Sequence, residues 1–321
     1  MHHTQIHLTN NCNLKCLHCY QDSYSNPVMG IDNYKLLINE LKTNGVSSIS
    51  LTGGEPFTIK NFKDYLDLSV NNFDSIAILT NGLLINDNIC EYLINASKKV
   101  KIFVQVSLEG PKKINDLIRG EGTFDKITKS IDFMKSKGVP FVVVSCTIAP
   151  YNYNRLDELY FYLNDNTKAD CIWFDRLIPM KQEDYISIDQ FKTVLNQLRS
   201  IETLYDSNIT RVKIRRIRAL QFLATKENTC YKCAAGVGTI TVMPNMDIML
   251  CRRLNFPVGN LLDKSLSEIL ISSKDLINQV HSVPNDCKSC KYAEKCNGGL
   301  KCLTYNKYHD FNHKDINCFI N

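Results

Sequence analysis

The sequence predicts an α/β fold in which a parallel sheet is covered by helices and followed by a smaller, loop-rich domain. Three observations lead to this prediction. Short apolar, β-branched runs alternate with segments of helical spacing through about the first two thirds of the 321 residues. The alternation stops after about residue 205. Cysteines then become frequent, with eight of the 14 lying after residue 229. We therefore expect two domains, 1–205 and 206–321.

Six short runs have the composition of buried strands, and they cover residues 4–9, 46–53, 75–80, 101–108, 141–148 and 170–177. Segments with helical spacing lie between them, for example 32–45, 86–99 and 123–138. Six β/α units predict a parallel sheet with helices outside it. They are too few for a complete eight-stranded barrel, which leaves a partial barrel or an open sheet.

Residues at the predicted helix ends support this division. Asp32, Asn86 and Thr123 are predicted N-caps, because their side-chain oxygens can accept hydrogen bonds from the first helical turn. Gly45 and Gly138 follow their helices as C-terminal stops. The later basic run RVKIRRIR is interpreted as a solvated strand, and a patch that binds an acidic ligand is the alternative.

The composition is that of a soluble globular enzyme, with 44% hydrophobic and 22% charged residues. A formal net charge of +5 does not require a nucleic-acid partner, and none is expected. The start MHHTQIHLTN lacks the basic and apolar regions of a signal peptide. No apolar stretch approaches the roughly 20 residues that span a bilayer. We therefore expect a cytoplasmic protein that does not act in a membrane.

Clustered cysteines in a reducing compartment indicate metal or catalytic ligands rather than disulfides. Cys90, Cys146 and Cys171 stand alone in apolar or helical segments, and we interpret them as packed thiols. The remaining cysteines gather in two places, the segment NNCNLKCLHCY near the start and the part after residue 229. These two groups are the candidate ligands.

Small and polar residues follow four consecutive predicted strands. In chain order they are Cys12, Cys16 and Cys19, then Gly53, Gly54 and Glu55, then Asn81, and then Glu109. The carboxyl ends of parallel strands meet at one edge of a sheet, and that edge is where α/β enzymes place their chemistry. We therefore expect these residues to surround one site.

A 4Fe–4S cluster takes four ligands, one for each iron. Three thiolates in one loop would therefore bind three of the irons and leave the fourth open. An open metal position is where a substrate or cofactor binds. The alternative is a zinc ion held by the three cysteines and His18. His18 adjoins Cys19, and adjacent residues rarely reach one tetrahedral ion together, which disfavours zinc.

The spacing Cx3Cx2C of Cys12, Cys16 and Cys19, followed by TGGEP at 52–56, resembles the radical S-adenosylmethionine (SAM) superfamily. The resemblance covers residues 4 to about 180 and implies a six-unit partial (β/α)6 TIM barrel. It also implies that the three cysteines hold a SAM-binding 4Fe–4S cluster. The residues that it implies for SAM binding are Gly53, Gly54, Glu55, Ser107, Glu109 and Arg119.

Each of these residues has an implied role. The Gly-Gly-Glu segment matches the part of the family that binds the methionyl amino group. Ser107 and Glu109 match positions facing the ribose and methionyl end of SAM, although many members carry Asp where Glu109 stands. Arg119 matches a frequent partner of the SAM carboxylate, a role that suits a guanidinium fork. A surface arginine is the alternative for Arg119.

The resemblance implies radical chemistry. In the family a low-potential cluster passes one electron to the sulfonium of SAM, and the carbon–sulfur bond breaks. The resulting 5′-deoxyadenosyl radical abstracts an unactivated hydrogen, while the protein sets potential, distance and exclusion of water. A reductant such as a flavodoxin or ferredoxin is therefore an expected partner.

The C-terminal cysteines resemble the SPASM domain, an auxiliary-cluster module that follows many radical SAM barrels. CAAG at 233–236, MPNMDIMLCR at 243–252 and CKSCKYAEKCNGGLKC at 287–302 match its order. The resemblance implies two auxiliary 4Fe–4S clusters, one held by Cys287, Cys290, Cys296 and Cys318, the other by Cys230, Cys233, Cys251 and Cys302.

This part of the chain departs from the family pattern after its two glycines. The family usually has a cysteine there, whereas this chain has Leu300 and places Cys302 two residues later. A single auxiliary cluster, with an open iron or a free thiol at the second position, is therefore the alternative. A zinc ribbon built on the CxxC pairs is a further alternative, but it leaves at least three of the eight cysteines unexplained.

SPASM-bearing relatives mostly modify peptides, so we expect radical modification of a ribosomally made peptide, by a crosslink, a thioether or epimerisation. Cys230 or Cys233 could be a hydrogen-atom donor in epimerisation rather than an iron ligand. The alternatives are a radical step in tetrapyrrole or other cofactor synthesis, formylglycine formation, and an Fe–S electron-transfer module without turnover. Arg252 stands where sulfatase-maturing relatives usually carry an Asp base, which counts against formylglycine formation.

Overall fold

The computed structural model of the chain describes residues 2–21, 28–215, 219–224 and 232–320. Within them one sheet has the strand order β10-β9-β8-β1-β2-β3-β4-β5-β6-β7. The strands are β1 His3–His7, β2 Ser48–Thr52, β3 Ser75–Thr80, β4 Lys101–Ser107, β5 Val142–Ile148, β6 Cys171–Arg176, β7 Lys213–Arg215, β8 Thr239–Val242, β9 Asp247–Met249 and β10 Gly259–Asn260. Neighbours from β8 to β7 are parallel, whereas β9 pairs antiparallel with β8 and β10.

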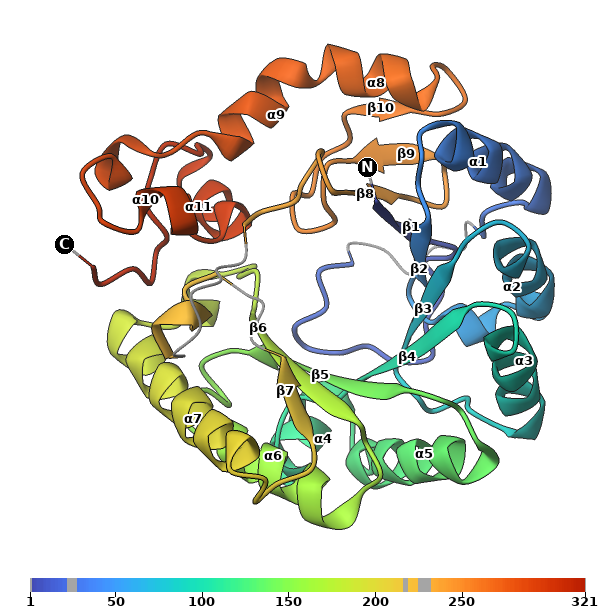
Figure 1. The fold of residues 1–321 in the computed structure, drawn as a ribbon, viewed down its shortest axis with the longest axis horizontal. Coiled ribbons are helices and arrows are strands. Elements are labelled where there is room, and N and C mark those ends of the chain that lie inside the picture. The colour runs from blue at the N-terminus through green and yellow to red at the C-terminus, as the bar shows by residue number, and fades with distance from the viewer. Residues whose placement is uncertain (1, 22–27, 216–218, 225–231, 321) are drawn as a thin grey trace.

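Helices cover the outer face of this sheet, which curves into an open barrel (Figure 1). Those of the barrel are α1 Ile31–Thr43, α2 Phe62–Val70, α3 Asp87–Ser97, α4 Lys112–Arg119, α5 Thr123–Lys137, α6 Leu156–Asn166 and α7 Ile188–Asp206. Those of the C-terminal part are α8 Leu266–Ser272, α9 Lys274–His281, α10 Ala293–Cys296 and α11 Lys301–Tyr308. The architecture is the predicted partial (β/α)6 barrel followed by a loop-rich C-terminal domain.

The predicted helix ends are partly wrong. Asn86 caps α3 as predicted, because its side chain accepts a hydrogen bond from the backbone N–H of Ile89. Asp32 and Thr123 are not N-caps, since α1 begins at Ile31 and α5 at Thr123 itself. Glycines precede both helices, and Gly122 takes a left-handed conformation that a glycine adopts without strain.

Alternation along the strands separates two faces of the sheet. On β4 the side chains of Ile102, Val104 and Val106 are buried in the apolar core that the outer helices cover. Gln105 and Ser107 point to the opposite face and are only half-buried. Gln105 donates a hydrogen bond to Ser145 of the next strand over 3.1 Å. The inner face of the barrel is therefore polar.

The sheet continues beyond the predicted domain boundary at residues 205 and 206. β7 follows that boundary and pairs with β6, and β8 pairs with β1. The strand interpretation of 211–218 is confirmed for Lys213–Arg215, and 216–218 lie outside the described residues. In the described part of the chain, no helix is long and apolar enough to cross a membrane.

Candidate active site

The three N-terminal cysteines lie in one loop that follows β1. The loop is anchored where Leu17 donates a backbone hydrogen bond to Ile118 of α4, over 3.0 Å. The backbone N–H of Cys19 donates to the carbonyl of Cys16, over 3.1 Å, which forms a tight turn between these two cysteines. All three thiols are half-buried. The fold therefore presents Cys12, Cys16 and Cys19 together at the carboxyl end of the first strand.

The electrostatics of these thiols fit a cationic ligand. Burial, together with ionised Cys19 and Cys12, raises the pKa of Cys16 to about 11, although Arg119 opposes the rise. Burial also raises the pKa of Cys12. Thiolates this close together repel one another, so a positively charged centre is needed to hold all three ionised. Three cysteines on one loop thus fit the iron–sulfur cluster that the sequence predicts.

His18 does not join the three cysteines. Its Nε2 lies 3.5 Å from Oε1 of Glu109, and its Nδ1 is buried without a hydrogen-bond partner. His18 therefore faces Glu109, which disfavours the zinc site with His18 as fourth ligand. Among the residues that the structure describes, no three Cys, His, Asp or Glu side chains converge on a single metal ion.

Gly53 and Gly54 let the loop after β2 run directly against the cysteine loop. A Cβ on Gly53 would lie 2.3 Å from the carbonyl oxygen of Thr9, and one on Gly54 would lie 2.3 Å from that of Asn11. The two loops instead pair through backbone hydrogen bonds, from Gly54 to Thr9 over 2.7 Å and from Glu55 to Asn11 over 2.8 Å. The glycines are thus required for this close approach.

Glu55 joins the ends of β2 and β3. Its buried carboxylate accepts hydrogen bonds from the backbone N–H of Asn81 over 2.7 Å and from Oγ1 of Thr80 over 2.8 Å. Burial raises the pKa of Glu55 to about 7, against the effect of these donors. Asn81 also donates to Asn13 over 2.7 Å, and its Nδ2 lies 3.9 Å from Sγ of Cys12. The third strand end therefore supports the cysteine loop.

Arg119 and Glu109 form a buried ion pair beside the same loop. Arg119 is 9% exposed, so the surface-arginine alternative is wrong. Its Nε donates to Glu109 over 3.1 Å, and its Nη1 lies 3.9 Å from Sγ of Cys16. Burial alone would raise the pKa of Glu109, but Arg119 and His18 outweigh burial and hold that pKa below its usual range. Ser107, the last residue of β4, lies two residues before Glu109 in the chain and is half-buried.

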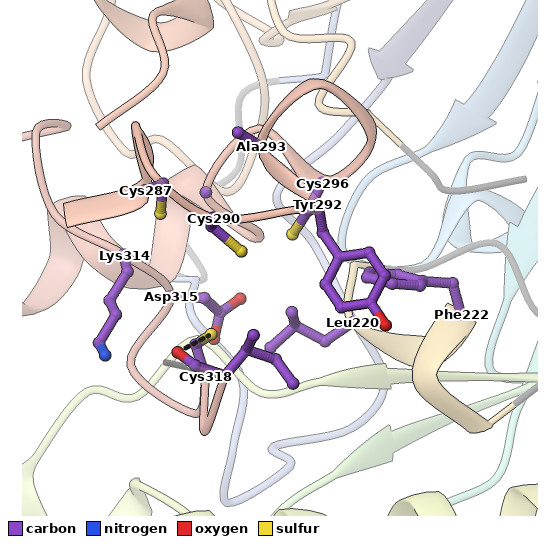
Figure 2. A pocket seen from close by; sticks show the side chains of 12 residues that line it. Leu220, Phe222, Cys287, Cys290, Tyr292, Ala293, Cys296, Lys314, Asp315 and Cys318 are labelled. Atoms are coloured by element: carbon purple, nitrogen blue, oxygen red, sulfur yellow. Dashed lines mark hydrogen bonds between the residues drawn. The ribbon is translucent and has the colours of Figure 1, made fainter. Parts of the chain in front are cut away.

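Four C-terminal cysteines surround a second space, and they are the first predicted auxiliary set. Figure 2 shows Cys287, Cys290, Cys296 and Cys318 with their side chains around one pocket. The backbone N–H of Cys290 donates to the carbonyl of Cys287 over 3.1 Å, which folds the CxxC pair into a turn. Leu220, Phe222 and Tyr292 supply an apolar wall. A pocket lined by four thiols has the donor set of a complete 4Fe–4S site.

Three members of the second predicted set also come together. Burial raises the pKa of Cys302 to about 12, and ionised Cys251 and Cys233 contribute to that rise while Arg253 opposes it. Burial similarly raises the pKa of Cys233 to about 11. Cys230, the fourth member, lies outside the described residues. The isolated thiols Cys90, Cys146 and Cys171 are buried, as predicted.

Sequence reasoning missed the contacts that fix the C-terminal cysteines to the barrel. Arg176 at the end of β6 makes a bidentate ion pair with Asp315, with both N···O distances 2.6 Å. The carboxylate of Asp315 also accepts a hydrogen bond from the backbone N–H of Leu300. The backbone carbonyl of Asp315 accepts one from the backbone N–H of Cys318. Arg253, two residues after Cys251, pairs with Asp175 of β6. No motif marks these pairs, because their partners lie far apart in the chain.

Comparisons with known proteins agree with this geometry. The family model described as the radical SAM superfamily matches residues 6–163. A mycofactocin maturase MftC from Mycolicibacterium smegmatis is 30% identical, over 91% of this chain and 76% of the relative. A cysteine-type anaerobic sulfatase-maturating enzyme from Clostridium perfringens is 24% identical, over 90% of this chain and 86% of the relative.

A solved structure shares the fold over nearly the whole chain. Streptococcus suis SuiB bound to the precursor peptide SuiA superposes with a TM-score of 0.78 at 20% identity. The match covers 99% of this chain and 76% of SuiB. At this identity the likeness shows the fold alone.

Proposed function

The chain belongs to the radical SAM superfamily, and from this premise we propose that it modifies a ribosomally made peptide. The observation that carries the proposal is the grouping of cysteines in two separate parts of the fold. Cys12, Cys16 and Cys19 gather at the end of β1, and separate C-terminal sets are fixed to the end of β6. A peptide entering the polar inner face of the barrel would reach both.

The N-terminal loop is proposed to hold the SAM-binding 4Fe–4S cluster through its three cysteines. When bound, the cluster and SAM supply the chemistry that removes a hydrogen atom from an unactivated carbon. Gly53, Gly54, Glu55, Ser107, Glu109 and Arg119 are the proposed SAM-contacting residues. The close approach of the two loops and the burial of Arg119 against Cys16 support this assignment.

The residues of the chain itself position and shield the site. Glu109 holds Arg119 by its Nε, which leaves Nη1 directed toward Cys16 and available to a carboxylate. Glu55 fixes the ends of two strands, so the cysteine loop rests on a rigid edge. Because Glu55 and Glu109 are buried, water has little access to this side of the loop.

The C-terminal cysteines are proposed to hold two auxiliary clusters, in the two sets that the sequence predicts. The four-thiol pocket supports the first set, and the mutual proximity of Cys233, Cys251 and Cys302 supports the second. Cys230 and Cys233 are proposed as iron ligands, and a hydrogen-atom donor at either position is the alternative. The proposed electron source is a small reductant protein such as a flavodoxin or ferredoxin.

A peptide substrate is favoured over the other substrate classes. Support comes from the maturase relative and from the fold shared with SuiB, whose structure holds a precursor peptide. The sulfatase-maturating relative raises formylglycine formation as an alternative. However, the residue after Cys251 is Arg252, and a guanidinium cannot accept a proton as the carboxylate base of that reaction would. Membership of an enzyme superfamily also disfavours a module that only transfers electrons.

The proposal is tested with the enzyme reconstituted anaerobically with iron and sulfide. It is incubated with SAM, dithionite and synthetic peptides encoded by short reading frames beside its gene. We expect 5′-deoxyadenosine together with a change in mass of one peptide, and neither product with the Cys12→Ala, Cys16→Ala, Cys19→Ala triple variant. Formation of 5′-deoxyadenosine that never modifies any such peptide would contradict the peptide substrate while leaving the radical chemistry in place.

A further inference from the structure

Arg252 is a buried cation that has no anionic partner among the residues that the structure describes. It is 5% exposed, and its Nε is buried without a hydrogen-bond partner. Nη1 donates to Oδ1 of Asn255 over 2.6 Å, and Nη2 makes a long contact of 3.4 Å with the carbonyl of Tyr20. Within the described part of the chain, no carboxylate pairs with it. Burying a charge in this way is costly unless an anion arrives to compensate it.

Other arginines near this end of the barrel do not share this feature. The pairs are Arg119 with Glu109, Arg176 with Asp315, and Arg253 with Asp175. Arg253 is the direct neighbour of Arg252, so the local backbone does not prevent pairing. Among the described residues, the chain therefore supplies carboxylates to the arginines around Arg252 and none to Arg252 itself.

The position of Arg252 places it between the two groups of cysteines. Arg252 follows Cys251 directly, and its guanidinium carbon lies 4.5 Å from the ring centroid of Tyr20, which follows Cys19. Tyr20 is 37% exposed, so part of its surface is open to a ligand. A molecule that contacts Arg252 and Tyr20 would thus lie between the N-terminal loop and the C-terminal cysteines, where the substrate of the proposed reaction has to lie.

The surroundings of Arg252 contain a second unpartnered group. His7 at the end of β1 is buried, and its Nε2 has no hydrogen-bond partner. Burial and the charge of Arg252 lower the pKa of His7 to about 3, so His7 is neutral near pH 7. A neutral imidazole adds no counter-charge, but it can donate one hydrogen bond. Arg252 and His7 are thus two buried groups with unpartnered nitrogens, and each can donate to an acceptor that carries negative charge.

We propose that Arg252, with Tyr20 as a wall, binds a carboxylate of the peptide substrate. The enzyme would then require an acidic side chain or a free C-terminus close to the residue that it modifies. A guanidinium suits a carboxylate because parallel N–H donors match its two oxygens, and Nε is the donor of Arg252 without a partner among the described residues. This inference rests on the proposed peptide substrate and deepens it.

A different counter-charge is available in principle. Cys19 and Cys251 adjoin Tyr20 and Arg252 in the chain, and both carry negative charge when they bind iron. If those thiolates alone compensated Arg252, its removal would change the reduction potential of a cluster and would leave peptide binding unaltered. The two roles therefore separate in their measurable consequences.

The test uses holoenzyme with SAM and a synthetic library of short random peptides, prepared once with a free C-terminal carboxylate and once as the amide. Bound peptides are recovered under anaerobic conditions and sequenced by mass spectrometry. We expect wild-type enzyme to enrich acidic peptides, or the free-acid library, by about tenfold or more, since a hydrogen bond to a charged group supplies that much. If acidic peptides are enriched from both libraries, the carboxylate that binds belongs to a side chain. If the free-acid library is enriched over the amide library, the carboxylate is the C-terminus of the peptide.

Variants make the test specific to Arg252. Arg252→Gln should lose the acidic preference, and Arg252→Lys should keep part of it. Arg155→Gln, at an arginine about half-exposed in its pair with Glu158, is the control and should bind peptides as wild type does. Iron content and the potential of each cluster, measured by electron paramagnetic resonance, verify that the variants are intact.

Four outcomes would overturn the inference. Enrichment without an acidic preference, or a preference that survives in Arg252→Gln, would remove the subsite and leave the peptide substrate standing. A shifted cluster potential in Arg252→Gln with unchanged peptide binding would assign Arg252 to the thiolates instead. Failure of wild-type enzyme to enrich any peptide would overturn the peptide substrate itself, and the subsite with it.

Discussion

The barrel and the C-terminal domain are stabilised in different ways. The barrel buries apolar side chains from eight parallel strands, β1 to β8, against the outer helices. The C-terminal domain has a small apolar core and short helices. It also buries charges, among them Lys301 at 1% exposure, whose Nζ donates to the carbonyl of Ser282 over 2.8 Å. The difference teaches that the barrel can hold its shape through apolar burial, whereas we expect the C-terminal domain, with its small apolar core, to depend on the clusters proposed for its cysteines.

Removal of iron should reveal the largest difference in stability between the barrel and the C-terminal domain. We expect amide hydrogen exchange around Cys287–Cys318 to accelerate by about a hundredfold or more, because metal binding is part of the folding free energy there. Amides of β2, β3 and β4 should change little. Hydrogen exchange measured by mass spectrometry on iron-loaded and on chelator-treated protein gives the exchange rates of both groups of amides. Equal protection of the C-terminal amides in the two samples would show that the domain is stable without iron.

Loss of the Arg176–Asp315 pair should have the next largest effect. Arg176→Met leaves the buried carboxylate of Asp315 without its cation, which costs about 3–5 kcal/mol. Arg253→Met is the matched variant, because the Arg253–Asp175 pair is partly exposed, and we expect a smaller cost.

Anaerobic urea unfolding, followed through the fluorescence of Trp173 on β6, measures both variants. The chain contains one tryptophan, so the signal reports on the strand that carries Arg176 and Asp175. Similar losses in the two variants would contradict the difference in burial.

Glu55 should make the stability of the barrel depend on pH. Burial raises its pKa in the folded protein to about 7, above the unfolded value, so the folded state binds the extra proton. The stabilisation is complete below the unfolded pKa and is lost as the pH rises through about 7. Between pH 5.5 and 7 the free energy of unfolding should fall by about 2 kcal/mol relative to Glu55→Gln. Parallel pH profiles of the two proteins would contradict this assignment.

The smallest expected effects concern the helix ends of the barrel. Asn86→Ala removes the side-chain acceptor that caps α3 and should cost about 1 kcal/mol. Asp32→Ala should cost only a few tenths of a kcal/mol, because Asp32 lies in the first turn of α1 and interacts only with the helix dipole and with Lys35, in an exposed ion pair. The same urea titration compares them. A larger loss for Asp32→Ala would restore its predicted role as the cap.

The strands of the barrel could be predicted from the sequence because their signals are local. The run at 75–80 matches β3 at both ends, since alternating apolar residues and flanking turn residues define it. The cysteine loop and its neighbouring glycines could also be predicted, because spacing alone marks them. The first residues of helices were harder to predict. Gly122 and Thr123 both suit the N-cap position of α5, and only the backbone conformation shows that Gly122 occupies it.

The links between the two domains could not be predicted. Arg176 and Asp315 are 139 residues apart, and nothing in either local segment indicates the partner. The same holds for Arg252 and Tyr20, which meet only because β8 pairs with β1 and returns the chain to the first loop. Pairs of this kind depend on the complete fold, so their energetic and functional roles become visible only in the structure.

Iron content and SAM cleavage, measured together on wild type and on the Cys12→Ala, Cys16→Ala, Cys19→Ala variant, test the account most directly. Wild-type protein reconstituted anaerobically should bind about twelve iron atoms and form 5′-deoxyadenosine with SAM and dithionite. The variant should retain about eight iron atoms, all in the C-terminal sites, and form none. Continued formation of 5′-deoxyadenosine by the variant, or zinc in place of iron at the C-terminal cysteines, would contradict the account.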